Sequence, residues 1–87
     1  TTAVDVTSAI TEINATSATH SCAMADGTDG QIKVIVNTST SGTNAITITP
    51  ANFSNSTITL DAAGETAVCL FKNSKWYVIG GNAPTVA

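Results

Sequence analysis

Residues branched at Cβ dominate this chain and constrain its fold more than any other feature. Thr occurs 16 times, Ile 8 times and Val 7 times among 87 residues, whereas Leu occurs only twice. Such side chains lose rotamer freedom in a helix and pack well on a pleated sheet. We therefore expect an all-β protein whose strands are joined by turns of Asn, Ser and Gly.

The length allows one domain with a thin core. At this size about 60% of the surface of the unfolded chain can be buried. Charged residues make up 10% of the chain, well below the usual share of about 25%, so the chain lacks the high charge typical of disorder. We expect a small antiparallel β-sandwich or barrel-like domain of short strands. Its predicted parts are an N-terminal arm at residues 1–14, a β domain at 15–82 and a C-terminal tail at 83–87.

Alternating segments predict the individual strands. The segment 31–37 places Ile32, Val34 and Val36 on one face and Lys33, Ile35 and Asn37 on the other. Further strands are predicted at 17–25, 45–49 and 56–60. Pro50 ends the second of these because proline cannot donate to a β-ladder. The Asp- and Gly-rich segment 26–30 predicts a turn.

The N-terminal arm is the least regular segment. Its anchors are Val4, Val6, Ile10 and Ile13, whose spacing fits a helical face as well as a strand. Because its apolar residues are sparse and small, we expect the arm to dock on a partner and not to complete the core of its own subunit. A chain without its first twelve residues is then expected to fold and to lose that partner.

The C-terminal segment predicts a hairpin that is apolar on both faces. Strands at 66–72 and 75–80 flank Asn73-Ser74, so that Phe71 opposes Trp76 and Cys69 opposes Val78. One face then carries Ala67, Cys69, Phe71, Trp76 and Val78, and the other carries Val68, Leu70, Tyr77 and Ile79. A half-exposed antiparallel strand would alternate apolar with polar residues. We therefore expect a second surface on this hairpin, supplied by a symmetric subunit contact or by the arm.

The charge and the length of the apolar runs argue against two classes of partner, nucleic acids and membranes. Three Lys, no Arg and six acids give a net charge of −3, whereas binding a nucleic-acid backbone takes many cationic contacts. No apolar run approaches the roughly 20 residues of a membrane-spanning helix, and the N-terminus lacks the basic and apolar regions of a signal peptide. We expect neither nucleic acid nor membrane as a partner.

Few residues could carry chemistry. His20 lies two residues before Cys22, but no carboxylate nearby in sequence would orient the histidine, so a structural histidine is favoured over a catalytic pair. Asp26 and Asp29 could bind Ca²⁺, yet the EF-hand spacing is absent and a turn is favoured. Cys22 and Cys69 permit one disulfide, although buried free thiols are favoured. We expect no catalytic residue, metal or cofactor.

Trp76 and Tyr77 raise the alternative of a sugar-stacking platform. Adjacent residues in a strand point to opposite faces, so both rings cannot stack on one ligand. Burial of these rings is favoured.

Five segments together suggest a family. They are 25–36 (ADGTDGQIKVIV), 45–53 (AITITPANF), 56–65 (STITLDAAGE), 67–71 (AVCLF) and 75–81 (KWYVIGG). Their order resembles a β domain that recurs in virion structural proteins of tailed bacteriophages, particularly aquatic and cyanobacterial phages. The resemblance covers about residues 25–82. It implies a virion role and a trimer, and it transfers no catalytic residue.

Two functions follow from this resemblance. The first is a capsid decoration (cement) protein, which is made in the host cytoplasm, binds the major capsid protein at the capsid surface and stabilises the shell as a homotrimer. The alternative is a tail or fibre module that binds a host receptor or glycan through the loops 38–44 and 50–56. The short chain favours the first. The residues expected at the oligomer interface or core are Val68, Leu70, Phe71, Trp76, Tyr77 and Ile79, and those expected in a capsid-docking arm are Val4, Val6, Ile10 and Ile13.

Overall fold

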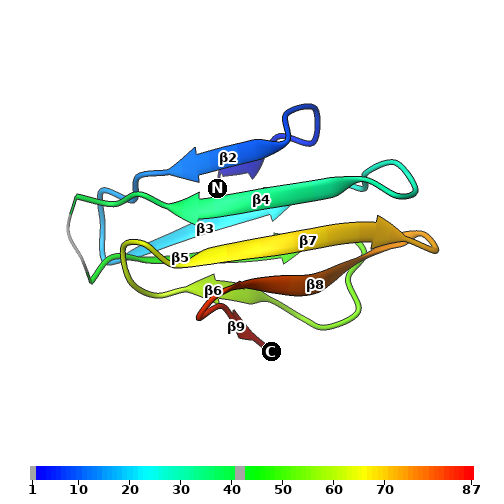
Figure 1. Ribbon diagram of the computed structural model, residues 1–87. Helices are drawn as coiled ribbons and strands as arrows, with labels where there is room; N and C mark the ends of the chain where they lie inside the picture. The colour runs from blue at the N-terminus through cyan, green and yellow to red at the C-terminus, as the bar shows by residue number, and fades with distance from the viewer. Residues whose placement is uncertain (1, 41–42) are drawn as a thin grey trace.

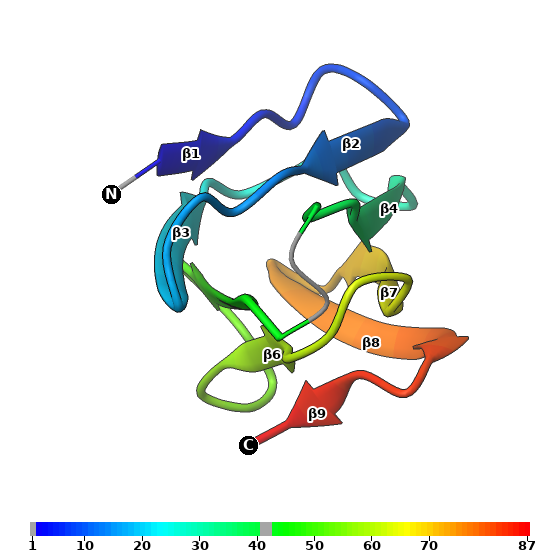
Figure 2. The ribbon, with the colours of Figure 1, turned by 90° about the vertical axis from the view of Figure 1, so that its left-hand side faces the viewer.

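The computed structural model describes residues 2–40 and 43–87, and these residues form an all-β sandwich without a helix. Figure 1 shows one sheet in front of the other, and Figure 2 shows the two layers end-on. The strands of the described residues are β1 (Thr2–Val4), β2 (Ile10–Ile13), β3 (Thr19–Met24), β4 (Ile32–Asn37), β5 (Ala45–Pro50), β6 (Ile58–Leu60), β7 (Thr66–Lys72), β8 (Lys75–Asn82) and β9 (Thr85–Val86). The predicted all-β class is confirmed.

Both sheets are mixed, whereas the sequence predicted antiparallel pairing. One sheet has the order β1-β3-β5-β6-β9 and the other the order β2-β4-β7-β8. The pairs β1–β3, β3–β5 and β2–β4 are parallel, and the remaining pairs are antiparallel. The first five strands alternate between the two sheets. Each time the chain comes back to a sheet, it therefore runs in the same direction as the strand it left there. The intervening strand in the opposite sheet serves as the crossover that parallel neighbours require.

The C-terminal hairpin has the predicted register. Phe71 pairs with Trp76 and Cys69 with Val78, and a bulge then shifts the register so that Val68 pairs with Gly80. The turn residues Asn73 and Ser74 have φ values of 55° and 66°. Positive φ at both central residues is the geometry that matches the twist of a two-residue hairpin.

The predicted separation of an N-terminal arm is wrong. Residues of the segment 1–14 form β1 at the edge of one sheet and β2 at the edge of the other. Val4 and Ile13 are buried in the core at 3% and 9% exposure, and Val6 packs against it. Parallel pairing with β3 and β4 supplies the hydrogen bonds that a free arm would lack. The arm thus completes the core of its own chain.

The predicted C-terminal tail is also part of the sandwich. Thr85 and Val86 form β9, which pairs with β6 at the edge of the first sheet. The amide of Ala87 donates to the carbonyl of Thr57 at 3.0 Å. The β domain therefore extends beyond its predicted limit at residue 82.

Trp76 is the largest side chain in the core and is fully buried. Its indole Nε1 donates to the carbonyl of Ala25 at 2.9 Å, and its ring meets Phe71 edge-on with centroids 5.2 Å apart. A Cβ atom at Gly27 would lie 2.8 Å from this ring, so only glycine allows the turn to pack so closely. The turn predicted at 26–30 therefore also closes one end of the core.

The buried side-chain amide of Asn37 connects the strands at the other end of the sandwich. Asn37 is fully buried, and its Nδ2 donates to the carbonyls of Asn44 and Leu60, each at 3.0 Å. Its Oδ1 accepts from the backbone amide and the hydroxyl of Ser39. That hydroxyl accepts in turn from the amide of Ala15 at 2.9 Å. Because every member is satisfied, this network stabilises the junction of both sheets.

Deletion of residues 1–12 is expected to unfold the protein. The deletion removes β1 and most of β2, and it leaves the buried ammonium of Lys33 without Asp5, Ser8 and Thr11. Uncompensated burial of a charge costs roughly 3–5 kcal/mol, a large part of the stability of a small domain. Circular dichroism should show loss of the cooperative thermal transition, whereas Ile10→Thr, at an exposed position, should retain it. A truncated chain with an unchanged melting temperature would contradict this assignment.

Candidate interaction surface

The sheet β2-β4-β7-β8 presents an apolar surface away from the core, which we call the outer face. Its members are Ile10, Ile32, Val34, Val36, Val68, Leu70, Tyr77 and Ile79. The register places them in rows across the strands. One row is Ile32, Leu70 and Tyr77, and the next is Ile10, Val34 and Val68. Cross-strand neighbours in register point to the same side of a sheet, so these side chains form one continuous surface.

The outer face is open in the single chain. Ile10, Ile32 and Ile79 are 60%, 46% and 54% exposed, and the other five members are half-buried. Single exposed aliphatic side chains are ordinary, but a contiguous group of them on one sheet makes the outer face a candidate interaction site.

The predicted interface residues divide between the two sides of this sheet. Phe71 and Trp76 belong to the core, at 6% and 0% exposure. Val68, Leu70, Tyr77 and Ile79 belong to the outer face. The sequence left open which side of the hairpin is core, and the structure assigns the side of Phe71 and Trp76 to it.

The predicted docking residues of the arm also separate. Val4 and Ile13 are buried in the core, and Val6 is half-buried against it. Ile10 alone lies on the outer face, where it pairs with Val34. The arm therefore contributes one residue to the surface that the hairpin predicted.

Sequence reasoning missed the contribution of β4. Alternation places Ile32, Val34 and Val36 on one side of a strand, but it does not predict that this side belongs to an interaction surface. They face outward because Lys33, on the opposite side of β4, is fully buried. A Lys in an alternating strand normally marks the solvent side, so the sequence held no signal for this inversion.

Lys33 is compensated by residues of the β1–β2 loop and of β2. Its Nζ donates to the carbonyl and hydroxyl of Ser8 at 2.9 and 3.1 Å and to the hydroxyl of Thr11, and it lies 3.8 Å from Asp5 Oδ1. Backbone and hydroxyl hydrogen bonds from Ser8 and Thr7 hold the pKa of Asp5 far below its usual range. Asp5 thus stays ionised beside the ammonium at neutral pH.

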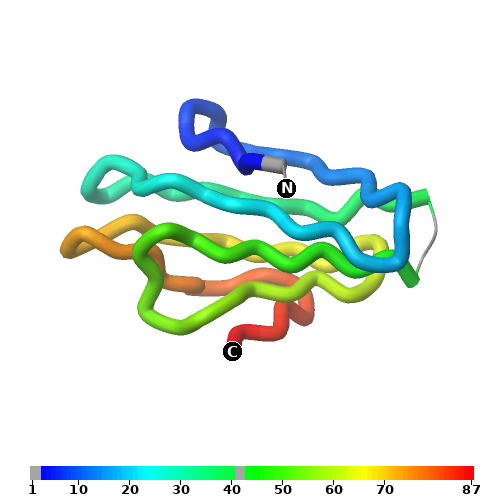
Figure 3. Tube along the Cα trace, turned by 180° about the vertical axis from the view of Figure 1, so that it is seen from behind, coloured from blue at the N-terminus to red at the C-terminus, as the bar shows by residue number. Residues whose placement is uncertain are grey.

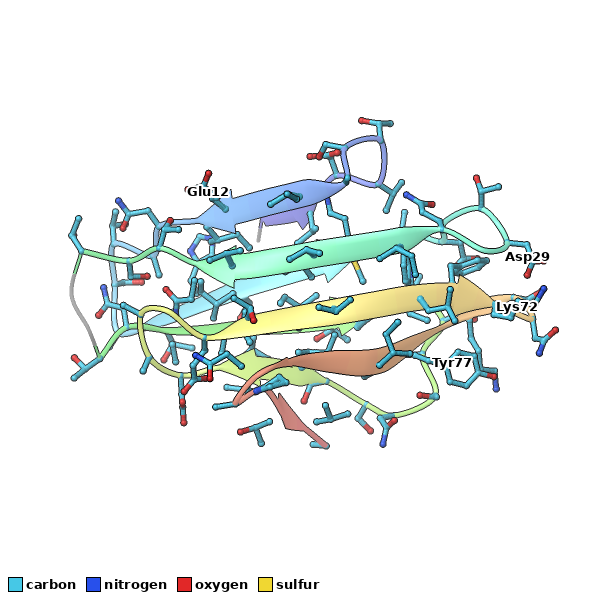
Figure 4. All side chains as sticks on the ribbon, in the orientation of Figure 1. Glu12, Asp29, Lys72 and Tyr77 are labelled. Atoms are coloured by element: carbon cyan, nitrogen blue, oxygen red, sulfur yellow. The ribbon has the colours of Figure 1, made fainter. Side chains whose placement is uncertain are left out.

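Charged side chains border the outer face at both ends of the strands, as Figure 4 shows. Glu12 pairs in register with Val36 at one end. At the other end Lys72 binds Asp29 at 2.9 Å, and this hydrogen bond lowers the pKa of Asp29. An apolar centre with a charged border is the usual composition of a protein–protein interface.

The opposite sheet carries a hollow of about 410 Å³ near β1. Small and aliphatic residues line it, among them Ala3, Met24 and Ala51, and Asp5 is its one charged residue. Its lining holds no buried polar side chain that would orient a ligand.

The loops predicted to bind a receptor leave opposite ends of the sandwich. The loop 38–44 joins β4 to β5 and the loop 50–56 joins β5 to β6, and the two lie far apart in Figures 1 and 3. Ser41 and Gly42 of the first loop lie outside the described residues. The two loops therefore do not form a common binding surface.

Among the residues considered for chemistry, the two cysteines and Trp76 are buried, and the two aspartates have structural partners. Cys22 and Cys69 are free, buried thiols, and His20 is half-buried. Asp26 accepts hydrogen bonds from Asn52, and Asp29 binds Lys72. Among residues 2–40 and 43–87, no three metal-binding side chains gather. Trp76 is inaccessible to a sugar, and Tyr77 lies on the other side of the sheet.

The described part of the chain contains no helix with the length and apolar character needed to cross a membrane. Compared with known proteins, the chain matches no family model, and no curated protein matches its sequence.

Stability should fall as the pH rises through the titration of the buried thiols. Burial raises the pKa of Cys69 from 9.0 to about 11 and also raises that of Cys22. Between pH 9 and 11 the unfolded chain therefore loses thiol protons that the folded chain retains, which favours unfolding. Thermal melts should show a smaller fall over this range for Cys69→Ala than for the wild type. An identical fall in both proteins would contradict the burial of this thiol.

Proposed function

We propose that this chain is a non-catalytic structural protein of a phage virion, namely a capsid decoration (cement) protein that acts as a homotrimer. The observation that carries the proposal is the outer face. Eight apolar side chains lie together there, and no segment of the described chain covers them. Burial of apolar surface contributes about 25 cal/mol per Å², so such a face favours association.

The sequence resemblance supports the viral part of the proposal. The matching segments extend over both strands of the C-terminal hairpin and over β4 to β6. The outer face is drawn largely from β4 and this hairpin. The same residues thus support both the resemblance and the proposed contact.

The charges support protein partners over nucleic acid. Of the three lysines, Lys33 is buried and Lys72 is paired with Asp29, so only Lys75 remains for an anionic partner. We propose the major capsid protein as the partner and the capsid surface as the location, after synthesis in the host cytoplasm. No cofactor enters the proposal.

Tyr77→Asp should dissociate the trimer while leaving the subunit folded. Tyr77 is half-buried on the outer face, and a carboxylate there would be desolvated only in the oligomer. Loss of an aromatic contact that is buried at an interface weakens association by about 30-fold or more. Sedimentation at micromolar concentration measures the mass, and circular dichroism checks the fold. A wild-type protein that sediments only as a compact monomer would remove the proposed self-association.

Copy number separates the decoration protein from the alternative tail or fibre module. A cement protein occupies symmetry-related sites over the shell and reaches on the order of hundreds of copies, whereas a tail module is limited to one vertex. Quantitative mass spectrometry of purified particles should find the high number. Because the chain has few cationic side chains to be screened, three Lys and no Arg, a high-salt wash should release little protein. A count of a few trimers per particle would favour the tail module.

A further inference from the structure

The four-stranded sheet has two different edges that run in the same direction. β2 forms one edge, beside β4, and β8 forms the other, beside β7 (Figure 1). β2 is parallel to β4, and two antiparallel steps lead from β4 through β7 to β8, so β8 is parallel to β2. An unpaired strand edge is a template for pairing with another chain. The two edges could therefore meet between copies as a parallel pair.

The chain itself covers only the first part of the β8 edge. The amide of Trp76 donates to the carbonyl of Asn52 at 2.9 Å, and the carbonyl of Trp76 accepts from the amide of Ser54 at 3.0 Å. Alternate residues of a strand direct their backbone groups to the same edge, so Val78 also points its N–H and C=O outward. In the described part of the chain, the backbone of residues 78–82 has no hydrogen-bond partner outside β7. This stretch carries neither a charged side chain nor proline, two features that protect edge strands.

β2 presents backbone groups at the opposite edge. The carbonyls of Ala9 and Ile13 accept from amides on the β4 side, each at 2.9 Å. By the same alternation, Ile10 and Glu12 direct their backbone groups to the free edge, and both residues are exposed. The carbonyl of Ile10 accepts from the hydroxyl of Ser8 at 3.3 Å and keeps a second lone pair for a partner.

Gly80 lies in the open part of β8, and the single chain gives no reason for a glycine there. Its φ is not positive, it is exposed, and a Cβ atom would meet nothing within 4 Å. Each other glycine of the described chain has a positive φ or packs closely against a neighbour, namely Gly27, Gly30, Gly64 and Gly81. Glycine within a strand lowers stability and often marks a place where another backbone approaches closely. Gly80 and the open edge thus point independently to the same stretch.

We propose that neighbouring copies of this chain join edge to edge, with the open part of β8 in one copy paired in parallel with β2 of the next. This rests on the proposed self-association and specifies its contact. A ring of three requires a head-to-tail contact between two different patches of each subunit, and opposite edges of one sheet are such patches. Rotation about an axis along the strands preserves their direction, so every contact in the ring is the same parallel pair.

The free backbone groups define the register of this contact. Val78 donates to the carbonyl of the partner's Ile10 and accepts from the amide of the partner's Glu12. Gly80 then lies beside the partner's Glu12 on the side of the outer face. The apolar outer faces surround the ring axis, so side chains at the joints between sheets have the least space, and Gly80 fits such a joint. Each chain buries both edges of this sheet in addition to the outer face.

A proline at position 12 tests the backbone hydrogen bond in the full-length protein. Glu12→Pro removes an N–H that points away from β4, so the subunit should stay folded. The trimer should weaken by about tenfold or more, because the partner's Val78 carbonyl loses its donor. Glu12→Gln removes the same charge, keeps the N–H and should associate as the wild type does. Sedimentation velocity at micromolar concentration measures association, and circular dichroism checks the fold.

A side chain at position 80 tests the joint. Gly80→Val places a residue that favours strands in open space, so the melting temperature of the subunit should not fall. Association should weaken by about tenfold or more because the joint becomes overpacked. Ala23→Val adds bulk at an exposed position of β3 in the other sheet and should leave association unchanged.

An engineered disulfide identifies which edges meet. With Glu12→Cys and Gly80→Cys in one chain, oxidation should link the subunits into covalent trimers, and either substitution alone should link none. The native thiols of Cys22 and Cys69 are buried. A covalent dimer from Gly80→Cys alone would show that two β8 edges meet about a two-fold axis, and it would overturn the proposal.

The outcomes distinguish this inference from the proposed function. A wild-type trimer that Glu12→Pro and Gly80→Val leave intact would overturn the edge contact and leave self-association standing. A wild type that sediments only as a monomer would overturn both. If Glu12→Pro unfolds the subunit, Gly80→Val and the cysteine pair decide. Copy number on particles is measured separately, so its failure would remove the decoration role without affecting the contact between β8 and β2.

Discussion

The buried ammonium of Lys33 is the constraint on which the arrangement of this sandwich depends. It lies between the sheets at 0% exposure, and the β1–β2 loop supplies its hydrogen bonds and the nearby carboxylate of Asp5. A buried charge without such partners would cost several kcal/mol. The loop must therefore close over β4, which places β1 in one sheet and β2 in the other. The side of β4 opposite Lys33 must then face outward.

This inversion accounts for the apolar outer face. Ile32, Val34 and Val36 join the outward residues of the hairpin because the inward positions of β4 are taken by Lys33, Ile35 and Asn37. Two of those three inward residues are polar and need hydrogen-bond partners instead of contributing apolar area. A chain of 87 residues has little surplus core. Association through the outer face would add the burial that the interior lacks.

The three lysines of this acidic chain have three different surroundings. Lys33 fixes the interior, Lys72 joins the β7–β8 turn to the turn at Asp29, and Lys75 remains at the border of the outer face. Each position has a different electrostatic setting, although all three residues lie on β4 or the hairpin. Along this sheet Lys72 and Lys75 lie at one end of the outer face and Glu12 lies at the other end.

The sequence by itself determined the all-β class, the approximate strands and the register of the hairpin, because β-branched composition, period-two alternation and the Asn73-Ser74 turn act locally. Tertiary structure decided the mixed pairing, the place of residues 1–14 in both sheets, and the choice of core side in β4 and β7. Alternation defines two sides of a strand but not which is inside when both are apolar. Lys33 is buried only because Ser8 and Thr11, more than 20 residues away in the sequence, meet it in the fold.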